Sequence, residues 1–369
     1  VRTPPFVLLQ VINNDVPTRA SPTPPRNLAN YFLGQPLVDP NATPGISTGG
    51  TDYRTTYTQT WNLNIQREFA HNIAIEVGYV GNKGTRTQHS SEYNIPFPGP
   101  GNIQARRPYP QWGVLDYKIW GGSSTYESLQ AKVEKRFSNG FSFLGSYAFS
   151  KCLDGPGSEE GGSPVYYLDN QNKGRCDFDV PQNFVTSYIL ELPFGRGRKF
   201  LASAPRVVDF LVGGWQWQGI NTLQSGVPYS VGINVDRANT GVSQRPNAIA
   251  APVQPRDLGC WYYTSSNPTC RALLPNQTDT FVLPAQFTYG NAGRNILRGD
   301  RLVQLDMSLI KNFRVTESKN IDFRAQVFNL TNTPSFSNPS GTVNLATGGQ
   351  ITSTRNQPRL YEFGMKFNF

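Results

Sequence analysis

The chain has 369 residues and a net charge of +9, and 16% of its residues are charged while 12% are aromatic. The 35 glycines and 29 prolines, with many Asn, Thr and Ser residues, favour strands and turns over helices. This composition excludes an all-α fold and disfavours a doubly wound α/β fold. The 22 Phe, 17 Tyr and 6 Trp also argue against intrinsic disorder.

Alternation of apolar and polar residues is the dominant pattern along the chain. In residues 57–69, for example, Trp61, Leu63 and Ile65 share one face, and Asn and Gln residues occupy the other. A period of two residues indicates β-strands. The pattern predicts nine strands, at 57–69, 72–82, 125–138, 141–151, 182–193, 211–225, 302–313, 319–330 and 357–369.

The predicted strands are long, at about 11 to 15 residues, whereas strands of globular proteins have about 5–6. A strand that crosses an outer membrane needs about 9–11 residues with one apolar face toward lipid and one polar face toward the lumen. We therefore expect an all-β fold: part of an antiparallel transmembrane β-barrel, with about nine long up-and-down strands and long extracellular loops. A soluble secreted β-protein is an alternative, because its strands alternate as well.

The connections between these strands fall into two classes. Short turns are expected at Ala70–His71, Ser138–Gly140 and Arg314–Ser318. Long loops are expected at 83–124, 152–181, 226–301 and 331–356. Outer membrane barrels have short periplasmic turns and long extracellular loops. If Phe369 lies in the periplasm, every short turn falls there and every long loop falls outside, and residues 112–120 form an extracellular hairpin arm rather than a crossing.

The count of nine crossings is odd, whereas single-chain bacterial barrels have an even number of strands. It therefore predicts that earlier strands are missing from this chain. On this interpretation residues 1–56 are the remnant of an extended extracellular loop, and residues 57–369 are the C-terminal part of an outer membrane barrel. The two outer strands would keep unpaired edges, so we expect an open, curved sheet or a forced closure between 57–69 and 357–369.

The four cysteines match no zinc-binding spacing and include no CxxC pair. Proximity along the chain favours disulfides Cys152–Cys176 and Cys260–Cys270, although four cysteines allow three connectivities. Disulfides would indicate an oxidising compartment. Four unpaired thiols are the alternative.

Two groups of aromatic residues are candidates for function. Rings at the membrane interface are predicted at Trp61, Tyr79, Tyr147, Trp215 and Trp217, where an aromatic belt meets the lipid headgroups. Packing on the sheet of a soluble barrel is the alternative for these five. Ligand contacts by stacking are considered for loop residues Trp112, Trp120, Trp261, Tyr262 and Tyr263, against packing within the loops.

The sequence offers little that points to catalysis or to a cofactor. His71 and His89 are too few for a His-rich metal site, and no GxSxG, HExxH or P-loop motif is present. Asp177 and Asp179 are considered as calcium ligands together with Asp169 or Asp154, but a polar loop held by a disulfide is the favoured interpretation. We therefore expect no enzyme activity and no cofactor.

The positive charge does not indicate nucleic-acid binding. The 34 basic residues are spread along the chain among 25 acidic ones, without a basic helix or a known module. The densest cluster is Arg196, Arg198 and Lys199 in FGRGRKF. A solvated turn is the favoured interpretation of this cluster, and contact with anionic lipid headgroups is the alternative.

Several stretches resemble one family when they are taken together and in order. They are QTWNLNIQREF (59–69), EVGYVGNKGT (76–85), RRPYPQWG (106–113), YESLQAKVEKRFSNGFSFLGSYAFSK (126–151), YILELPFGRGRKF (188–200), GGWQWQGINTLQSGVPYSV (213–231), GNAGRNILRGD (290–300), LDMSLIKNFRV (305–315) and IDFRAQVFNLTNTPSF (321–336). The chain resembles the C-terminal part of Oar-like TonB-dependent outer-membrane receptors of Gram-negative bacteria. It departs from them at Pro181-Gln182, where relatives usually carry a basic pair.

This resemblance implies a 22-stranded barrel that is closed by an N-terminal plug and takes up a large solute with energy from the TonB complex. The plug, through which TonB would act, has no counterpart in this chain, and the extracellular ligand is unknown. The alternative is a surface adhesion or binding barrel without transport. The last strand also resembles the signal that the barrel-assembly machinery reads, with Tyr361, Phe363, Phe367 and Phe369, although a plain lipid-facing strand has the same pattern. The implied location is the outer membrane.

Overall fold

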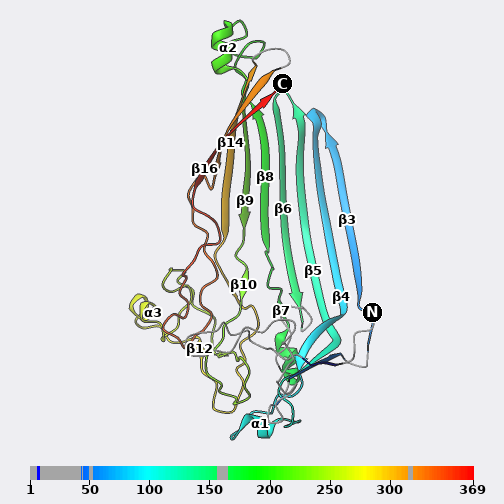
Figure 1. The fold of residues 1–369 in the computed structure, drawn as a ribbon, viewed down its shortest axis with the longest axis vertical. Coiled ribbons are helices and arrows are strands. Elements are labelled where there is room, and N and C mark those ends of the chain that lie inside the picture. The colour runs from blue at the N-terminus through cyan, green and yellow to red at the C-terminus, as the bar shows by residue number, and fades with distance from the viewer. Residues whose placement is uncertain (1–5, 9–42, 44, 50–52, 156–164, 315–318) are drawn as a thin grey trace, which may run out of the picture.

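The computed structural model describes residues 6–8, 43, 45–49, 53–155, 165–314 and 319–369. Its main feature is one sheet of long strands that lie side by side (Figure 1). Long connections gather at one end of the sheet, called the long-loop end, and short turns and the C-terminus lie at the other, called the short-turn end (Figure 1). The expected remnant at residues 1–56 falls mostly outside the described residues.

The predicted all-β fold and its nine long strands are confirmed. They are β3 (Tyr57–Phe69), β4 (Ile73–Glu92), β5 (Leu115–Ser138), β6 (Phe141–Asp154), β8 (Gln182–Glu191), β9 (Trp215–Gln224), β14 (Leu302–Arg314), β15 (Asn320–Phe328) and β16 (Leu360–Asn368). Each pairs antiparallel with the next in this order. This up-and-down arrangement places each long loop and each short turn between neighbouring strands.

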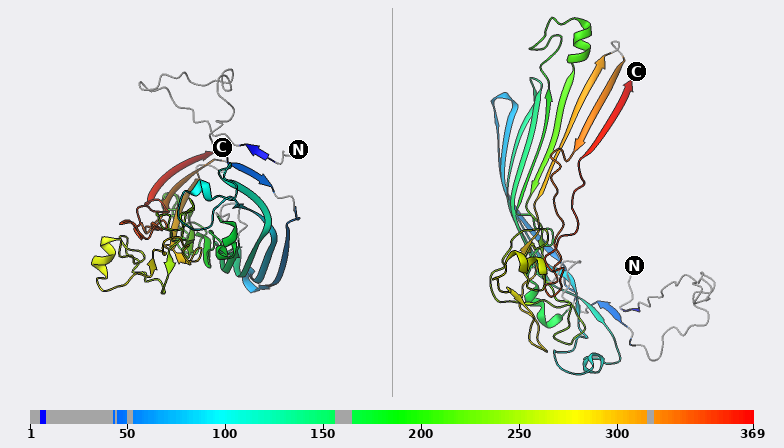
Figure 2. Two further views of the ribbon diagram at one scale, coloured as in Figure 1. Left: turned by 90° about the horizontal axis from the view of Figure 1, so that it is seen from below. Right: turned by 90° about the vertical axis from the view of Figure 1, so that its left-hand side faces the viewer.

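The sheet is open, as expected for a partial barrel. Within the described residues, β3 pairs only with β4, and β16 pairs only with β15. The view along the strands shows the sheet as a curved wall rather than a closed ring (Figure 2). Both outer strands therefore keep one edge of backbone N–H and C=O groups without a partner strand.

The strand register separates the residues into an apolar face and a polar face. Across three strands, Ile65 pairs with Val77, which pairs with Ala131. One position along, Gln66 pairs with Glu76, which pairs with Lys132. Because side chains alternate along a strand, the aligned pairs stack apolar on apolar and polar on polar. The sheet thus has the two faces of a barrel wall between lipid and an aqueous lumen.

Two strands are longer than their alternation predicted. The strand expected at 72–82 continues to Glu92, and the strand expected at 125–138 begins at Leu115. Their extensions pair with each other, for example His89 with Ile119. The segment 112–120 is therefore not a separate hairpin arm, since Leu115–Trp120 continues β5. The alternation missed this part because residues beyond the membrane have no lipid-facing side.

The strand expected at 211–225 also begins later, at Trp215. The residues before it form the helix α2 (Arg206–Val212), which follows Pro205 and ends at Gly213 and Gly214. Gly214 has φ of +70°, a conformation that favours glycine. The run of Val, Phe and Leu in α2 fits a strand as well as one short helix, so periodicity alone could not separate them.

The short turns use residues that tolerate positive φ. Asn139 and Gly140, between β5 and β6, have φ of +53° and +75°. This pair has the backbone signs of a type I′ turn, whose twist matches two antiparallel strands. His71 lies in the 3-10 turn η1 (Ala70–Asn72) with φ of +64°. Residues 315–318 of the third expected turn lie outside the described residues.

The remaining elements are small and lie mainly at the long-loop end. They are β1 (Phe6–Leu8), β2 (Ile46–Gly49), α1 (Ile103–Arg106), η2 (Tyr166–Asn172), β7 (Gly174–Arg175), β10 (Pro228–Tyr229), β11 (Asn247–Ala248), α3 (Pro268–Leu273), β12 (Phe281–Val282) and β13 (Leu297–Arg298). β2 runs parallel to the extension of β5. Among the described residues, no helix is both long enough and apolar enough to span a membrane.

Candidate functional site at the long-loop end

Two long loops fold together around a hydrophobic core of their own. Residues buried in it come from 226–301 and 331–356, namely Tyr229, Val231, Ile233, Trp261, Tyr262, Phe281, Ala292, Leu297 and Val343. The Tyr262 hydroxyl donates to the Ser340 carbonyl at 2.9 Å, and the Thr264 hydroxyl donates to the Val343 carbonyl at 2.6 Å. Loops of this length therefore form an ordered layer over the end of the sheet.

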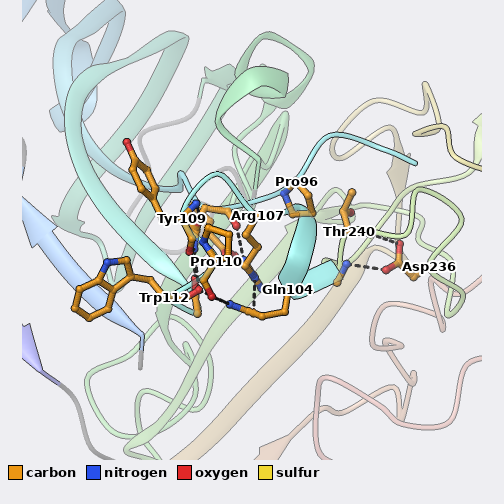
Figure 3. Close-up of polar contacts among 12 residues, drawn as sticks. Pro96, Gln104, Arg107, Tyr109, Pro110, Trp112, Asp236 and Thr240 are labelled. Carbon is orange, nitrogen blue, oxygen red and sulfur yellow. Dashed lines mark hydrogen bonds and ion pairs between the residues drawn. The ribbon is translucent and has the colours of Figure 1, made fainter. Parts of the chain in front are cut away.

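The RRPYPQWG segment at 106–113 wraps around one buried amide. The Asn94 side chain is fully buried, and its Nδ2 lies 3.0 Å from the Tyr109 and Trp112 carbonyls and 2.8 Å from that of Gly113 (Figure 3). Its Oδ1 accepts from the Tyr109 N–H at 2.9 Å. Arg107 also pairs with Glu92 at 3.0 Å. These contacts fix the turn and hold it against the end of β4.

A second group of polar residues joins the 93–114 loop, which contains this turn, to the 226–301 loop. Asn239 Nδ2 donates to the Gly99 carbonyl at 2.8 Å. Asp236 accepts from the N–H groups of Thr240 and Gly241 (Figure 3). The Tyr289 hydroxyl donates to Thr240 Oγ1 at 2.8 Å. Burial raises the pKa of Tyr289 above its ordinary value. The 93–114 loop is therefore part of the same ordered layer.

Three of the acidic residues considered as calcium ligands, Asp154, Asp177 and Asp179, contact arginine or asparagine side chains instead. Asp154 and Asp179 form ion pairs with Arg294 and Arg298, respectively. Asp177 accepts from Asn295 Nδ2 at 2.5 Å. In the described part of the chain, no group of three His, Cys, Asp or Glu side chains is placed to hold a metal ion. These contacts fasten the GNAGRNILRGD segment to the loop that follows β6.

Both disulfides join cysteines that are neighbours in sequence. Cys152 bonds to Cys176 with a Cα–Cα distance of 5.4 Å, and Cys260 bonds to Cys270 with a Cα–Cα distance of 5.1 Å. All four side chains are buried. The first disulfide ties the end of β6 to the acidic segment that binds Arg294 and Arg298, and the second closes the segment that contains α3.

The loop aromatics considered for ligand stacking differ in their surroundings. Trp261, Tyr262 and Tyr263 are 5%, 0% and 3% exposed, so their rings pack in the loop layer and no face is free for a ligand. For these three, packing is the correct interpretation. Trp112 and Trp120 are half-buried, and Trp120 contacts Tyr53 edge-on at 4.9 Å.

Two exposed rings were not singled out in the sequence. Phe97 is 65% exposed and stacks on Tyr167 with ring centroids 4.9 Å apart, and Tyr109 is 52% exposed. Both lie in the 93–114 loop, whose backbone is held by Asn94 and Arg107. A fixed backbone with exposed aromatic rings is typical of a surface that binds ligands by stacking. The signal was available in RRPYPQWG, where tyrosine stands between two prolines.

The polar face of the sheet contributes a hollow of its own. A cavity of about 670 Å³ lies against β5, β6, β8, β9, β14 and β15. Polar residues of the lumenal positions, such as Gln218, Ser308 and Gln326, line it together with Leu144 and Ile220. The wall therefore presents mixed polar and apolar side chains in the half of the sheet nearer the short-turn end.

The five predicted interface aromatics all lie on the apolar face. Trp61, Tyr79, Tyr147 and Trp217 are 37–41% exposed, and Trp215 is half-buried. Pairing across the sheet aligns Trp61 with Lys151 of β6, and Trp217 with Phe141 of the same strand. These two levels are separated along β6 by about the 9–11 residues of a membrane crossing. Tyr79 and Tyr147 lie between these levels.

The apolar side of the C-terminal strand is exposed. Its residues Tyr361, Phe363, Met365 and Phe367 are each more than half exposed, and Phe369 is 93% exposed. Phe363 stacks on Phe323 of β15, with ring centroids 6.4 Å apart. The four predicted signal residues therefore share one side of the chain at the free edge of the sheet.

Solved structures with a similar arrangement are outer membrane proteins. They include the outer membrane transporter YddB of Escherichia coli (TM-score 0.46, 12% identity), which matches 89% of this chain and 34% of its own. The ferric-catecholate import receptor Fiu of E. coli K12 matches 87% of this chain and 29% of its own (TM-score 0.39, 10% identity). P. aeruginosa FpvA, solved with heterologous pyoverdines, matches 85% and 27% (TM-score 0.39, 8% identity).

The chain thus spans 27–34% of the length of these solved proteins. No curated protein matches it. The model of one family, described as "Outer membrane beta barrel domain", matches residues 1–362, which is nearly the whole chain. The alternating strands, the two faces of the sheet and this match agree with one another. The chain belongs to the family of outer membrane beta barrel domains and is located in the outer membrane.

Proposed function

We propose that this chain forms the C-terminal part of the barrel wall of an Oar-like TonB-dependent receptor, which imports a large solute across the outer membrane. The observation that carries the proposal is the asymmetry between the ends of the sheet. The 226–301 and 331–356 loops fold together at the long-loop end, and the hairpin turn at Asn139–Gly140 lies at the short-turn end. In outer membrane barrels, long loops face outward and short turns face the periplasm.

The open edges support the part of the proposal that concerns further strands. Backbone groups of β3 and β16 that face away from β4 and β15 would have no partner in the bilayer. Each such group costs several kcal/mol in a hydrocarbon environment. Strands from outside residues 57–369 would pair with both edges and complete the barrel. The plug that couples such a barrel to TonB would lie against the polar face.

In this proposal the loop layer captures the solute first. The exposed rings Phe97 and Tyr109 offer stacking surfaces, and hydrogen bonds from the Asn94 side chain fix the backbone of their loop. Trp112 and Trp120 lie in or next to the same loop and are half-buried, so they would contact the solute at its rim. The barrel-assembly machinery would read Tyr361, Phe363, Phe367 and Phe369 during insertion.

Surface labelling of intact Gram-negative cells tests the orientation. All cysteines of the described chain are disulfide-bonded, so Tyr109→Cys introduces a single free thiol. A membrane-impermeant maleimide should label this variant in intact cells. A matched variant at the short-turn end, Asn139→Cys, should be labelled only after the cells are opened. The reverse result would contradict the orientation.

Transport is tested with the complete receptor in cells that have or lack TonB. Depletion of large solutes from the medium, measured by mass spectrometry, should require both the receptor and TonB. Phe97→Ala with Tyr109→Ala should reduce depletion at low solute concentration, whereas Phe287→Ala, at another exposed ring, should leave it unchanged. If solute binds to cells and TonB makes no difference, the alternative of a surface-binding barrel is supported instead.

A further inference from the structure

The link between β8 and β9 is larger than a barrel turn requires. It covers residues 192–214 and contains α2, which extends past the short-turn end of the strands (Figure 1). The Asp209 carboxylate accepts from the Arg196 N–H at 2.6 Å. The Gly195 N–H donates to the Phe200 carbonyl at 3.0 Å. Hydrogen bonds within the link therefore give it a defined fold.

This link exposes large apolar side chains. A turn that lies in water would bury them or have polar residues in their place. Val207 is 74% exposed, Leu211 is 61%, and Phe200, Leu201 and Phe210 are about half exposed. At about 25 cal/mol per Å², leaving such side chains in water is unfavourable. Contiguous exposed apolar residues of this kind mark an interaction surface.

The same link also carries basic side chains. Arg196, Arg198, Lys199 and Arg206 are exposed, and within the link only Asp209 is acidic. Arg198 pairs with Glu191 at 2.8 Å, while the other three form no ion pair within the described residues. Apolar side chains beside cations complement a membrane surface that carries anionic headgroups.

The link is continuous with the lipid-facing side of the wall. Phe210 of α2 contacts Phe313, an apolar-face residue of β14, with ring centroids 5.0 Å apart. Lys311, on the same face, is 1% exposed because its ammonium donates to the Gly213 carbonyl and lies over the Trp215 and Phe313 rings. The Trp215 Nε1–H donates to the Leu211 carbonyl at 3.0 Å. α2 therefore touches the face that meets the bilayer.

We propose that the 192–214 link is a membrane anchor: α2 inserts Val207 and Leu211 into the leaflet at the short-turn end, and Arg196, Lys199 and Arg206 bind anionic phospholipid headgroups. Interfacial helices gain affinity both from buried apolar area and from attraction to anionic lipid. The anchor would fix the depth of the barrel wall in the bilayer. It depends on the outer membrane location and does not depend on transport.

Site-directed spin labelling of the 369-residue chain in phospholipid vesicles tests this anchor. Val207→Cys and Leu211→Cys replace exposed residues, and Leu273→Cys in α3 at the long-loop end is the matched control, at 47% exposure. In vesicles that contain phosphatidylglycerol, labels at 207 and 211 should collide more often with oxygen than with a water-soluble nickel chelate. The label at 273 should show the opposite preference.

The charge requirement is tested in the same vesicles. Replacing Arg196, Lys199 and Arg206 by Gln, which leaves the Arg198–Glu191 pair intact, should make the label at 207 more accessible to nickel. With Arg196, Lys199 and Arg206 retained, the label at 207 should also become more accessible to nickel in vesicles of phosphatidylcholine alone. A label at 207 as water-accessible as the label at 273 would overturn the proposal. So would a label shielded from both reagents, since this would indicate a protein partner.

Discussion

The backbone N–H of Cys152 donates to Oδ1 of Asp179 at 2.8 Å, and Oδ2 of the same carboxylate accepts from Arg298. One carboxylate thus joins the end of β6 to the loop that leads into β14. The Asp179 side chain is 2% exposed and that of Arg298 is 25% exposed, so the ion pair is largely removed from water. This contact connects three segments that are far apart in sequence.

Loss of this carboxylate should loosen the loop layer. Asp179→Ala leaves the Cys152 N–H and the Arg298 guanidinium without their partner, and we expect it to cost about 2–3 kcal/mol of the free energy of unfolding. Hydrogen exchange in 174–181 and 290–300 should accelerate. The control Glu68→Gln removes an exposed pair with Arg136 at 3.6 Å and should cost less than about 0.5 kcal/mol. Equal effects of both variants would contradict the role of Asp179.

The disulfides should differ in what they contribute. Cys152 and Cys176 are 24 residues apart, and Cys260 and Cys270 are 10 residues apart. The chain-entropy relation gives about 3.5 kcal/mol for the first and about 2.7 kcal/mol for the second. Cys152→Ser with Cys176→Ser should therefore lower the unfolding temperature of the loop layer more than the other pair of substitutions. Peptide mapping without reduction checks the pairing, and a Cys176–Cys260 peptide would contradict it.

Most of the sheet could be predicted because each strand meets lipid on one side. Residues such as Leu63 and Ile65 must then be apolar while their neighbours are polar, and the alternation is strong. The outer parts of β4 and β5 escaped prediction because a polar run such as Gln88–Glu92 carries no such constraint. α2 was missed because its short apolar run fits either structure.

The loop layer was harder to predict than the sheet. Trp261, Tyr262 and Tyr263 are adjacent in a loop that has no hydrophobic periodicity. The sequence therefore cannot distinguish rings that are buried by packing from rings that are exposed to a ligand. Trp261 and Tyr262 are buried in a core that includes Val343, more than 70 positions away, whereas Tyr263 packs with Cys260 and Cys270. The pairing of the cysteines could be predicted because each one bonds to the nearest other cysteine in its part of the sequence.

Alkaline pH should open the loop layer. Burial raises the pKa of Tyr229 and of Tyr262 well above the ordinary value of about 10. Their neutral forms are therefore favoured in the folded layer, so the stability they contribute is fully present below pH 10 and is lost as pH rises above it. Each tyrosine should cost about 1.4 kcal/mol per pH unit in this range.

Tyrosinate absorbance and limited proteolysis, followed together across this pH range, check the expectation. The last tyrosines should ionise only as the loops become cleavable. Tyr109→Phe, at an exposed ring, should leave the cleavage midpoint unchanged, whereas Tyr229→Phe should move it to higher pH. Ionisation of every tyrosine near pH 10 with the loops intact would show that the two rings are not buried in solution.

The free edges of the sheet should be visible in amide exchange. Every second N–H of β3 points away from β4, and every second N–H of β16 points away from β15, whereas both edges of β8 are paired. For the 369-residue chain in detergent micelles, about half of the amides in β3 and β16 should therefore exchange fast, and those of β8 should stay protected. Hydrogen exchange read by mass spectrometry with fragmentation resolves these strands.

The complete receptor provides the comparison for this last measurement. If further strands pair with both edges, the fast amides of β3 and β16 should become as slow as those of β8. Light scattering on the isolated chain identifies the alternative in which two copies pair edge to edge, because the mass would double. Full protection of both edges in a monomer would mean that β3 and β16 close on each other, and the wall would then be a complete small barrel.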